Sequence, residues 1–128
     1  MPRKTLKQRQ QSSGIDKGLS IKKNLVGNES PDDIMEMIME TFPEELVPEV
    51  GSYYTFVYNP TTPNIQYDQY PLVAVTEVFA WGFRGINYHW GSARNYGWGE
   101  VVGKFHPVNT MELKTMRSLP YANYLINN

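Results

Sequence analysis

The aromatic side chains are concentrated in one stretch, and this constrains the fold more than any other feature of the chain. Of the 17 Phe, Trp and Tyr residues, 14 lie within residues 53–105. In YYTFVY, at the start of this stretch, every second position carries an aromatic ring on the same face of a predicted strand. Short strands that turn at Gly and Pro predict a mainly β fold with flanking helices. Its centre is expected to be a small, strongly bent antiparallel barrel over residues 51–108.

Glycine marks where the predicted strands turn or cross. The segment YPLVAVTEVF is apolar on both sides and is therefore predicted to be a centrally buried strand. The pair Trp81-Gly82 predicts a tight reversal between this strand and the next, FRGINYHW. Gly85 within the second strand suggests a bulge or a close approach of two backbones. The segment Gly82–Glu100 mixes glycines, aromatic rings, arginines and a histidine, which suits either a binding site or scaffold.

Residues 31–50 are predicted to form an acidic, methionine-rich helix followed by an extended connector. Ser30 suits the N-cap, Pro31 the first helical position, and Pro43 ends the helix. Its apolar side chains either pack on the chain's own core, the more common use of methionine at helical spacing, or contact a partner protein. The candidate partner contacts on this helix are Met35, Met37, Met39 and Phe42.

The net charge of −1 conceals three blocks of very different charge. Residues 1–24 carry +6, residues 25–50 carry −8 and residues 51–128 carry +1. The first 30 residues show no long apolar stripe, so we expect an extended basic arm, residues 1–30, that becomes ordered on binding a partner. The candidate contacts in this arm are Arg3, Lys4, Lys7, Arg9, Lys22 and Lys23. Residues 109–128 are expected to form a short C-terminal helix and a tail.

The sequence contains no arrangement of residues that indicates catalysis. It has no cysteine and only two histidines, and it lacks the Gly-x-Ser-x-Gly, phosphate-loop and dinucleotide-binding motifs. We therefore expect no catalytic, cofactor-binding or metal-binding residues, no small-molecule substrate and no enzyme activity. The sequence contains no run of 18 apolar residues, so we expect no membrane span. The basic N-terminus lacks the apolar region of a secretory signal.

Nucleic-acid binding remains an alternative, because basic residues lie among aromatic ones. Arg84, Arg94 and Lys104 are interspersed with Tyr88, Trp90, Tyr96 and Trp98. Small barrels combine such groups to bind single strands. However, two or three charges are few, and a barrel of this size needs its aromatic rings for the core. The acidic segment after the arm would also oppose phosphate binding. Protein contact is therefore favoured over DNA.

Residues 51–90 resemble a pattern found in small structural proteins of large contractile-tailed bacteriophages, including phage DNA-end protector proteins. The matching positions are Tyr58, Pro60, Tyr67, Asp68, Tyr70, Pro71, Leu72, Val73, Gly82, Phe83, Gly85, Ile86, Asn87 and His89. The resemblance implies a virion component with an SH3-like small barrel. It also implies that Asp68, Asn87 and His89 form a buried, hydrogen-bonded structural clasp in the barrel.

Together these features predict a structural component of a tailed-phage virion, in the tail, baseplate or neck, assembled in the host cytoplasm. It would join neighbouring subunits, other virion proteins and copies of itself, through the arm, the acidic helix and the C-terminal tail. The alternative is a DNA-binding protein that protects or completes packaged DNA ends at the head.

Overall fold

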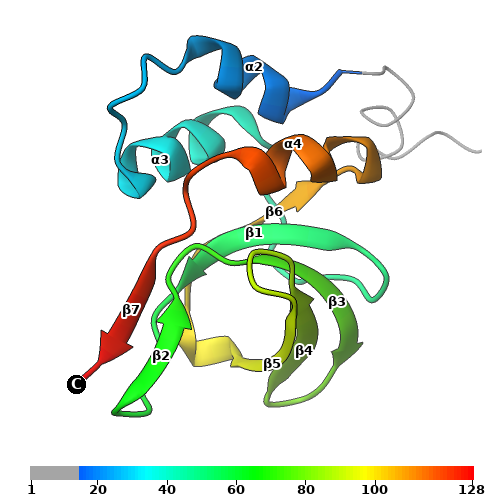
Figure 1. Ribbon diagram of the computed structural model, residues 1–128. Helices are drawn as coiled ribbons and strands as arrows, with labels where there is room; N and C mark the ends of the chain where they lie inside the picture. Colours follow the sequence, from blue (N-terminus) through cyan, green and yellow to red (C-terminus); the bar gives the residue numbers. More distant parts are fainter. Residues whose placement is uncertain (1–14) are drawn as a thin grey trace, which may run out of the picture.

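The computed structural model describes residues 15–128. The helices are α2 (Lys17–Asn24), α3 (Pro31–Thr41) and α4 (Leu113–Ser118), with 3₁₀ turns η1 (Trp98–Glu100) and η2 (Thr110–Glu112). The strands are β1 (Tyr53–Tyr58), β2 (Ile65–Asp68), β3 (Leu72–Val78), β4 (Gly82–Asn87), β5 (Ser92–Gly97), β6 (Val101–Val108) and β7 (Tyr124–Asn127). The three helices gather on one side of a curled sheet, and the short pair β2 and β7 lies beside the sheet, at the lower left in Figure 1. The chain is therefore mainly β with flanking helices.

Five strands form an antiparallel sheet in the order β5-β4-β3-β1-β6, and β2 pairs with β7 in a second sheet. Phe79 N–H donates to the Gly82 carbonyl at 2.7 Å, which confirms the predicted reversal between β3 and β4. The register of this strand pair shifts between Val75 and Glu77. A Cβ at Gly85 would collide with Val73 and the Ala74 carbonyl. Both the bulge and the close approach expected around Gly85 are present.

The sheet has a hydrophobic core on each of its two faces. The inner, curled face holds an aromatic core that includes Tyr54, Phe56, Tyr58, Phe83, Tyr96 and Phe105. The outer face packs with the helices in a second core that includes Ile21, Ile34, Met35, Ile38, Leu72, Met116 and Tyr121. Strand β1 serves both, because its alternate side chains point to opposite faces. Most aromatic rings of the predicted barrel are therefore structural.

Helix α3 forms as its sequence predicts. The Ser30 hydroxyl accepts a bond from Asp33 N–H, the Asp33 carboxylate accepts one from Ser30 N–H, and Pro31 is the first helical residue. The prediction of partner contacts was wrong for Met35 and Phe42, which are 1% and 4% exposed and lie in the helix-side core. The two residues share the apolar face of the helix, and that face covers the sheet.

The prediction of an extended arm was wrong for Lys17–Asn24, which form helix α2. Asp16 caps this helix by accepting a bond from Leu19 N–H, and Ile21 is buried against the helix-side core. The buried Glu112 carboxylate accepts bonds from Lys17 N–H at 2.5 Å and from the Lys17 ammonium at 3.2 Å. This contact spans 95 positions, which explains why a polar segment without an apolar stripe is folded here.

The C-terminal tail is also part of the fold. Strand β7 pairs with β2 from Ile65 to Asp68 in antiparallel register. The Asn127 side-chain amide adds bonds to the Pro60 and Thr62 carbonyls at 2.7 and 2.8 Å. The tail therefore pairs within its own chain, and its contact with a neighbouring subunit stays a prediction.

Candidate functional site

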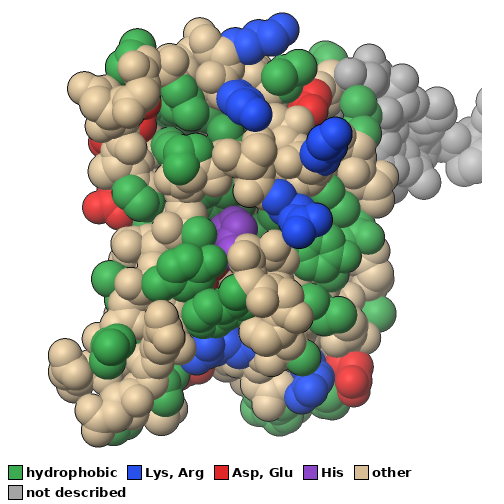
Figure 2. Space-filling view, viewed as in Figure 1, with side chains coloured by type: hydrophobic (Ala, Val, Ile, Leu, Met, Phe, Trp, Pro, Cys, Tyr) green, Lys and Arg blue, Asp and Glu red, His purple; other side chains and the backbone are tan. Residues whose placement is uncertain are grey.

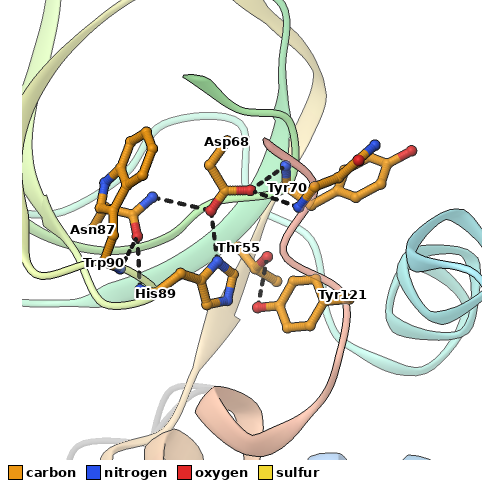
Figure 3. A network of polar contacts seen from close by, with 8 residues as sticks. Thr55, Asp68, Tyr70, Asn87, His89, Trp90 and Tyr121 are labelled. Carbon is orange, nitrogen blue, oxygen red and sulfur yellow. Dashed lines mark hydrogen bonds and ion pairs between the residues drawn. The ribbon is translucent and has the colours of Figure 1, made fainter. Parts of the chain in front are cut away.

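The structure brings Asp68, Asn87 and His89 together from three different segments (Figure 3). Asp68 ends β2, Asn87 ends β4, and His89 lies in the turn between β4 and β5. The Asp68 Oδ2 atom accepts bonds from Asn87 Nδ2 at 3.1 Å and from His89 Nδ1 at 2.6 Å. These three residues are called the clasp below.

The other oxygen of Asp68 ties the clasp to the rest of the chain. Asp68 Oδ1 accepts bonds from Tyr70 N–H and Asn123 N–H, each at 3.1 Å. The Asn87 side-chain oxygen accepts bonds from His89 N–H at 2.7 Å and Trp90 N–H at 3.3 Å. The Asp68 carboxylate thus joins β2, β4, the turn after β4 and the segment before β7 through four hydrogen bonds.

The hydrogen bond to Asp68 fixes the orientation and the tautomer of His89. A carboxylate can only accept hydrogen bonds, so His89 Nδ1 carries a hydrogen, and Nε2 of the neutral ring carries a lone pair. Nε2 is buried and has no hydrogen-bond partner within residues 15–128. The His89 ring lies edge-on to Tyr121, with centroids 4.9 Å apart. Burial raises the pKa of Tyr121, whose hydroxyl therefore stays protonated and donates to Thr55 Oγ1 at 3.2 Å.

A groove runs over the surface beside the clasp. It consists of two hollows of about 670 and 520 Å³ that share Tyr88, His89 and Arg117 as lining residues. The first hollow is also lined by Leu113, Lys114 and Tyr124, and the second by Trp90. Figure 2 shows a histidine at the floor of a hollow on this face, with Lys or Arg side chains at its edge. We call this surface the Tyr88–Arg117 groove.

The charge of the Tyr88–Arg117 groove comes from helix α4. Lys114 and Arg117 are exposed, and the Arg117 guanidinium lies over the Tyr88 ring at 5.8 Å. Burial raises the pKa of both Tyr88 and Tyr124, so these two hydroxyls are neutral at ordinary pH. The groove is therefore aromatic and cationic, a combination that suits an anionic group carried on an apolar or planar partner.

The remaining predicted contact residues are scattered. Lys22 and Lys23 are exposed on α2, and the Lys22 ammonium donates to Ser118 Oγ at 3.1 Å, close to the groove. On α3, Met39 is 47% exposed and Met37 is half-buried. Arg3, Lys4, Lys7 and Arg9 lie outside the described residues.

The proposed set of stacking and basic residues for nucleic acid is not brought together as a surface. Tyr96 is 1% exposed in the aromatic core, Lys104 pairs with Glu44 at 3.1 Å, and Arg84 bonds the Asn95 side chain. Arg94 does lie over the Trp90 ring, at 5.7 Å. Sequence reasoning missed Lys114 and Arg117, although their spacing of three on a predicted helix places them on one face.

Other features of the described chain bear on function. Residues 15–128 include no group of three His, Asp or Glu side chains placed to hold a metal ion. His106, the second histidine, is buried, and its Nδ1 lies 3.2 Å from the Pro43 carbonyl. In the same part of the chain no helix is long and apolar enough to cross a membrane.

The comparisons with known proteins identified no relative of this chain. No family model matches the chain, and neither the curated proteins nor the solved structures include a significant match.

Proposed function

We propose that this chain is a structural component of a contractile-tailed phage particle, in its tail, baseplate or neck, where it joins neighbouring subunits. The five-stranded sheet would be an SH3-like barrel. Its antiparallel order, β5-β4-β3-β1-β6, its curled shape and the 3₁₀ turn η1 between β5 and β6 support this assignment. Such barrels hold surface loops in fixed positions and carry many unrelated functions.

The observation that carries the proposal is an exposed apolar surface, here called the hairpin-tip surface. It comprises Leu46, Val47, Phe79, Trp81 and Trp98. Leu46, Val47 and Trp81 are 77%, 61% and 52% exposed. Large apolar side chains scattered singly are ordinary, but a contiguous group marks an interaction site.

Contacts within the hairpin-tip surface make it contiguous. The rings of Phe79 and Trp81 stack at 4.9 Å, and Trp98 Nε1–H donates to the Phe79 and Ala80 carbonyls at 3.2 and 3.0 Å. Trp98 also lines a hollow of about 360 Å³ with Leu46 and Val47. Rigid aromatic anchors beside a small hollow are typical of the centre of a protein–protein interface.

The resemblance of residues 51–90 to phage structural proteins supports the same proposal. The matched positions include the clasp residues, Gly82 and Gly85, which serve strand pairing, and Phe83 and Leu72, which are completely buried. The pattern thus falls mainly on residues that build the barrel. In this proposal the basic residues Arg3, Lys4, Lys7 and Arg9 add contacts to neighbouring subunits.

The test compares two valine substitutions in chains assembled into the particle. Val47→Asp places a charge in the hairpin-tip surface. Val26→Asp is the control, because it makes the same change at a valine that is 82% exposed and lies outside that surface. Neither valine is buried, so both variants should fold. We expect mass spectrometry of purified particles to show loss of the Val47→Asp chain and retention of the Val26→Asp chain. Equal retention of both would contradict the proposal.

A DNA-binding function at packaged ends is the second candidate, and the Tyr88–Arg117 groove favours it. Lys114 and Arg117 could contact phosphates beside exposed aromatic rings. This function predicts binding to short oligonucleotides that weakens steeply with salt and is lost in Lys114→Gln/Arg117→Gln. Binding that is absent at low salt would eliminate this candidate.

A further inference from the structure

The Tyr88–Arg117 groove has a counterpart of opposite charge on another face of the same chain. On α3, Asp33, Glu36, Met37 and Glu40 follow at positions i, i+3, i+4 and i+7, so they form one stripe along the helix. Together with Glu29 they line a hollow of about 320 Å³. The side chains of Glu36 and Glu40 are exposed and make no ion pair or hydrogen bond within residues 15–128.

We propose that the Tyr88–Arg117 groove binds the acidic outer face of helix α3 of a second copy of this chain. The inference rests on the proposed function as an assembly protein and deepens it by naming one contact between copies. The occupant is an amphipathic acidic helix, which is one of the common ways in which proteins recognise a peptide segment.

The spacing of charges on the two faces is complementary. Lys114 and Arg117 are three residues apart on α4, and Glu36 and Glu40 are four apart on α3, so each pair spans about one helical turn, roughly 5–6 Å. Two carboxylates can therefore reach two cations at once. Lys22, which is bonded to Ser118 at the end of α4, adds a third cation beside them.

The apolar parts of the two faces also correspond. Met37 lies between the two glutamates on α3 and is half-buried, and a flexible thioether adapts well to an irregular apolar hollow. Leu113, Tyr88 and Tyr124 line the hollow that would receive it.

The floor of the groove contains a polar atom that lacks a partner. The His89 side chain is 4% exposed, it lines both hollows, and its Nε2 makes no hydrogen bond within the described residues. A buried polar atom without a partner is uncommon in a complete fold and indicates that one is supplied from outside. The Nε2 lone pair needs a donor, whereas the Nε1–H of Trp90, which lines the second hollow and is also buried without a partner in residues 15–128, is a donor from which a carboxylate of the docked helix can accept.

An acidic protein segment fits the groove better than nucleic acid does. Lys114, Arg117 and Lys22 suffice for two or three carboxylates, whereas DNA binding depends on neutralising many phosphates. Because the groove and the acidic face are different surfaces, the contact is head-to-tail. Such contacts close into rings or continue as helical filaments, which are the forms that a tail or neck requires.

The experiment measures self-association by analytical ultracentrifugation of the full chain at about 0.05 M and about 0.5 M salt. The variants are Glu36→Lys on the acidic face and Arg117→Glu in the groove. Glu77→Lys is the matched control, because Glu77 is exposed on β3 and belongs to neither surface. We expect the unmodified chain and the Glu77→Lys chain to associate at low salt and to dissociate at high salt.

Each of the other variants alone should lose about tenfold or more in self-association affinity, since the reversal places like charges together. An equimolar mixture of Glu36→Lys and Arg117→Glu chains should associate again, because the native groove of the first meets the native α3 face of the second. A chain that is monomeric at low salt, or single variants that associate as the unmodified chain does, would overturn the inference. So would an oligonucleotide that binds the groove of a monomeric chain.

The outcome is separable from that of the proposed function. If copies do not associate but the chain is still incorporated into particles in a Val47-dependent way, only the copy-to-copy contact is refuted. If self-association follows the charge reversals but particles never contain the chain, the contact stands and the virion function fails.

Discussion

Replacement of Asp68 by asparagine tests whether the clasp holds the fold together. The substitution keeps the shape of the side chain but replaces one of two accepting oxygens by an amide group that only donates. In the native chain each oxygen accepts two hydrogen bonds, so any orientation of the new amide opposes two donors. Asp68 is 2% exposed, and water cannot easily replace the lost partners.

The magnitude follows from comparing the two orientations of the amide. If the NH₂ group faces the backbone N–H groups of Tyr70 and Asn123, both hydrogen bonds are lost. If it faces His89 and Asn87, the imidazole can move its hydrogen to Nε2 and accept at Nδ1, so only the bond from Asn87 is lost. This second arrangement costs less, so we expect the side chain to adopt it. The free energy of unfolding should then decrease by about 2–4 kcal/mol, which is the scale for losing a buried hydrogen bond to a charged group and leaving the Asn87 donor unpaired.

Two measurements check this reasoning. Urea unfolding followed by circular dichroism should give the decrease in stability, with Glu77→Gln on the exposed surface as a control that changes it by less than about 0.5 kcal/mol. Nitrogen NMR of the neutral His89 ring should show the Nδ1–H tautomer in the native chain and the Nε2–H tautomer in Asp68→Asn. An unchanged stability, or Nδ1–H in both proteins, would refute the structural role of the clasp.

Three further changes test other parts of the fold. Gly85→Ala should destabilise the chain by about 2–4 kcal/mol because its Cβ collides with β3, whereas Gly99→Ala, which has open space around it, should be neutral in the same urea titration. Burial raises the pKa of Glu100, but hydrogen bonds from Thr61, Tyr58 and Gly97 outweigh it, so the folded-state pKa lies below the ordinary 4.5. Stability should therefore fall as the pH drops from about 5 through that lower pKa, and Glu100→Gln should remove this part of the acid dependence. Glu112→Ala leaves the Lys17 ammonium, whose side chain is 12% exposed, without its carboxylate. Amide hydrogen exchange should then show α2 losing its protection while the amides of β1 keep theirs, and equal protection in both proteins would argue against this contact.

Local signals explain which parts of the fold could be predicted from the sequence. Helix α3 carries its own start, in Ser30 and Pro31, and its own apolar face, so no distant residue was needed to find it. The reversal at Gly82 and the close approach at Gly85 require glycine, because a Cβ atom at either position would collide with a neighbouring strand. The sequence alone could not decide whether Met35 packs in the chain's own core or contacts a partner protein, because both uses require the same spacing of apolar residues along the helix.

The parts that were missed depend on contacts between distant residues. Helix α2 is polar, and its first turn is fixed by Glu112, which is far away in the sequence. The four-residue strands β2 and β7 gain stability from pairing with each other, and neither carries a pattern long enough to predict it. The Tyr88–Arg117 groove combines a strand turn with α4 and β7, so no single segment indicates a binding surface.

The division between scaffold and surface within Gly82–Glu100 bears on how such a chain can specialise. Phe83, Gly85, Asn87 and Tyr96 are buried and serve the sheet, whereas Tyr88 and Trp90 from the same segment face the groove. Alternate residues along strand β4 point to opposite faces, so one segment can hold the sheet on one side while its other side varies. Substitutions that adapt the chain to a different neighbour should therefore accumulate at the groove and the hairpin tip. The clasp should tolerate few changes, because the Asp68 carboxylate joins separate segments of the fold through four hydrogen bonds.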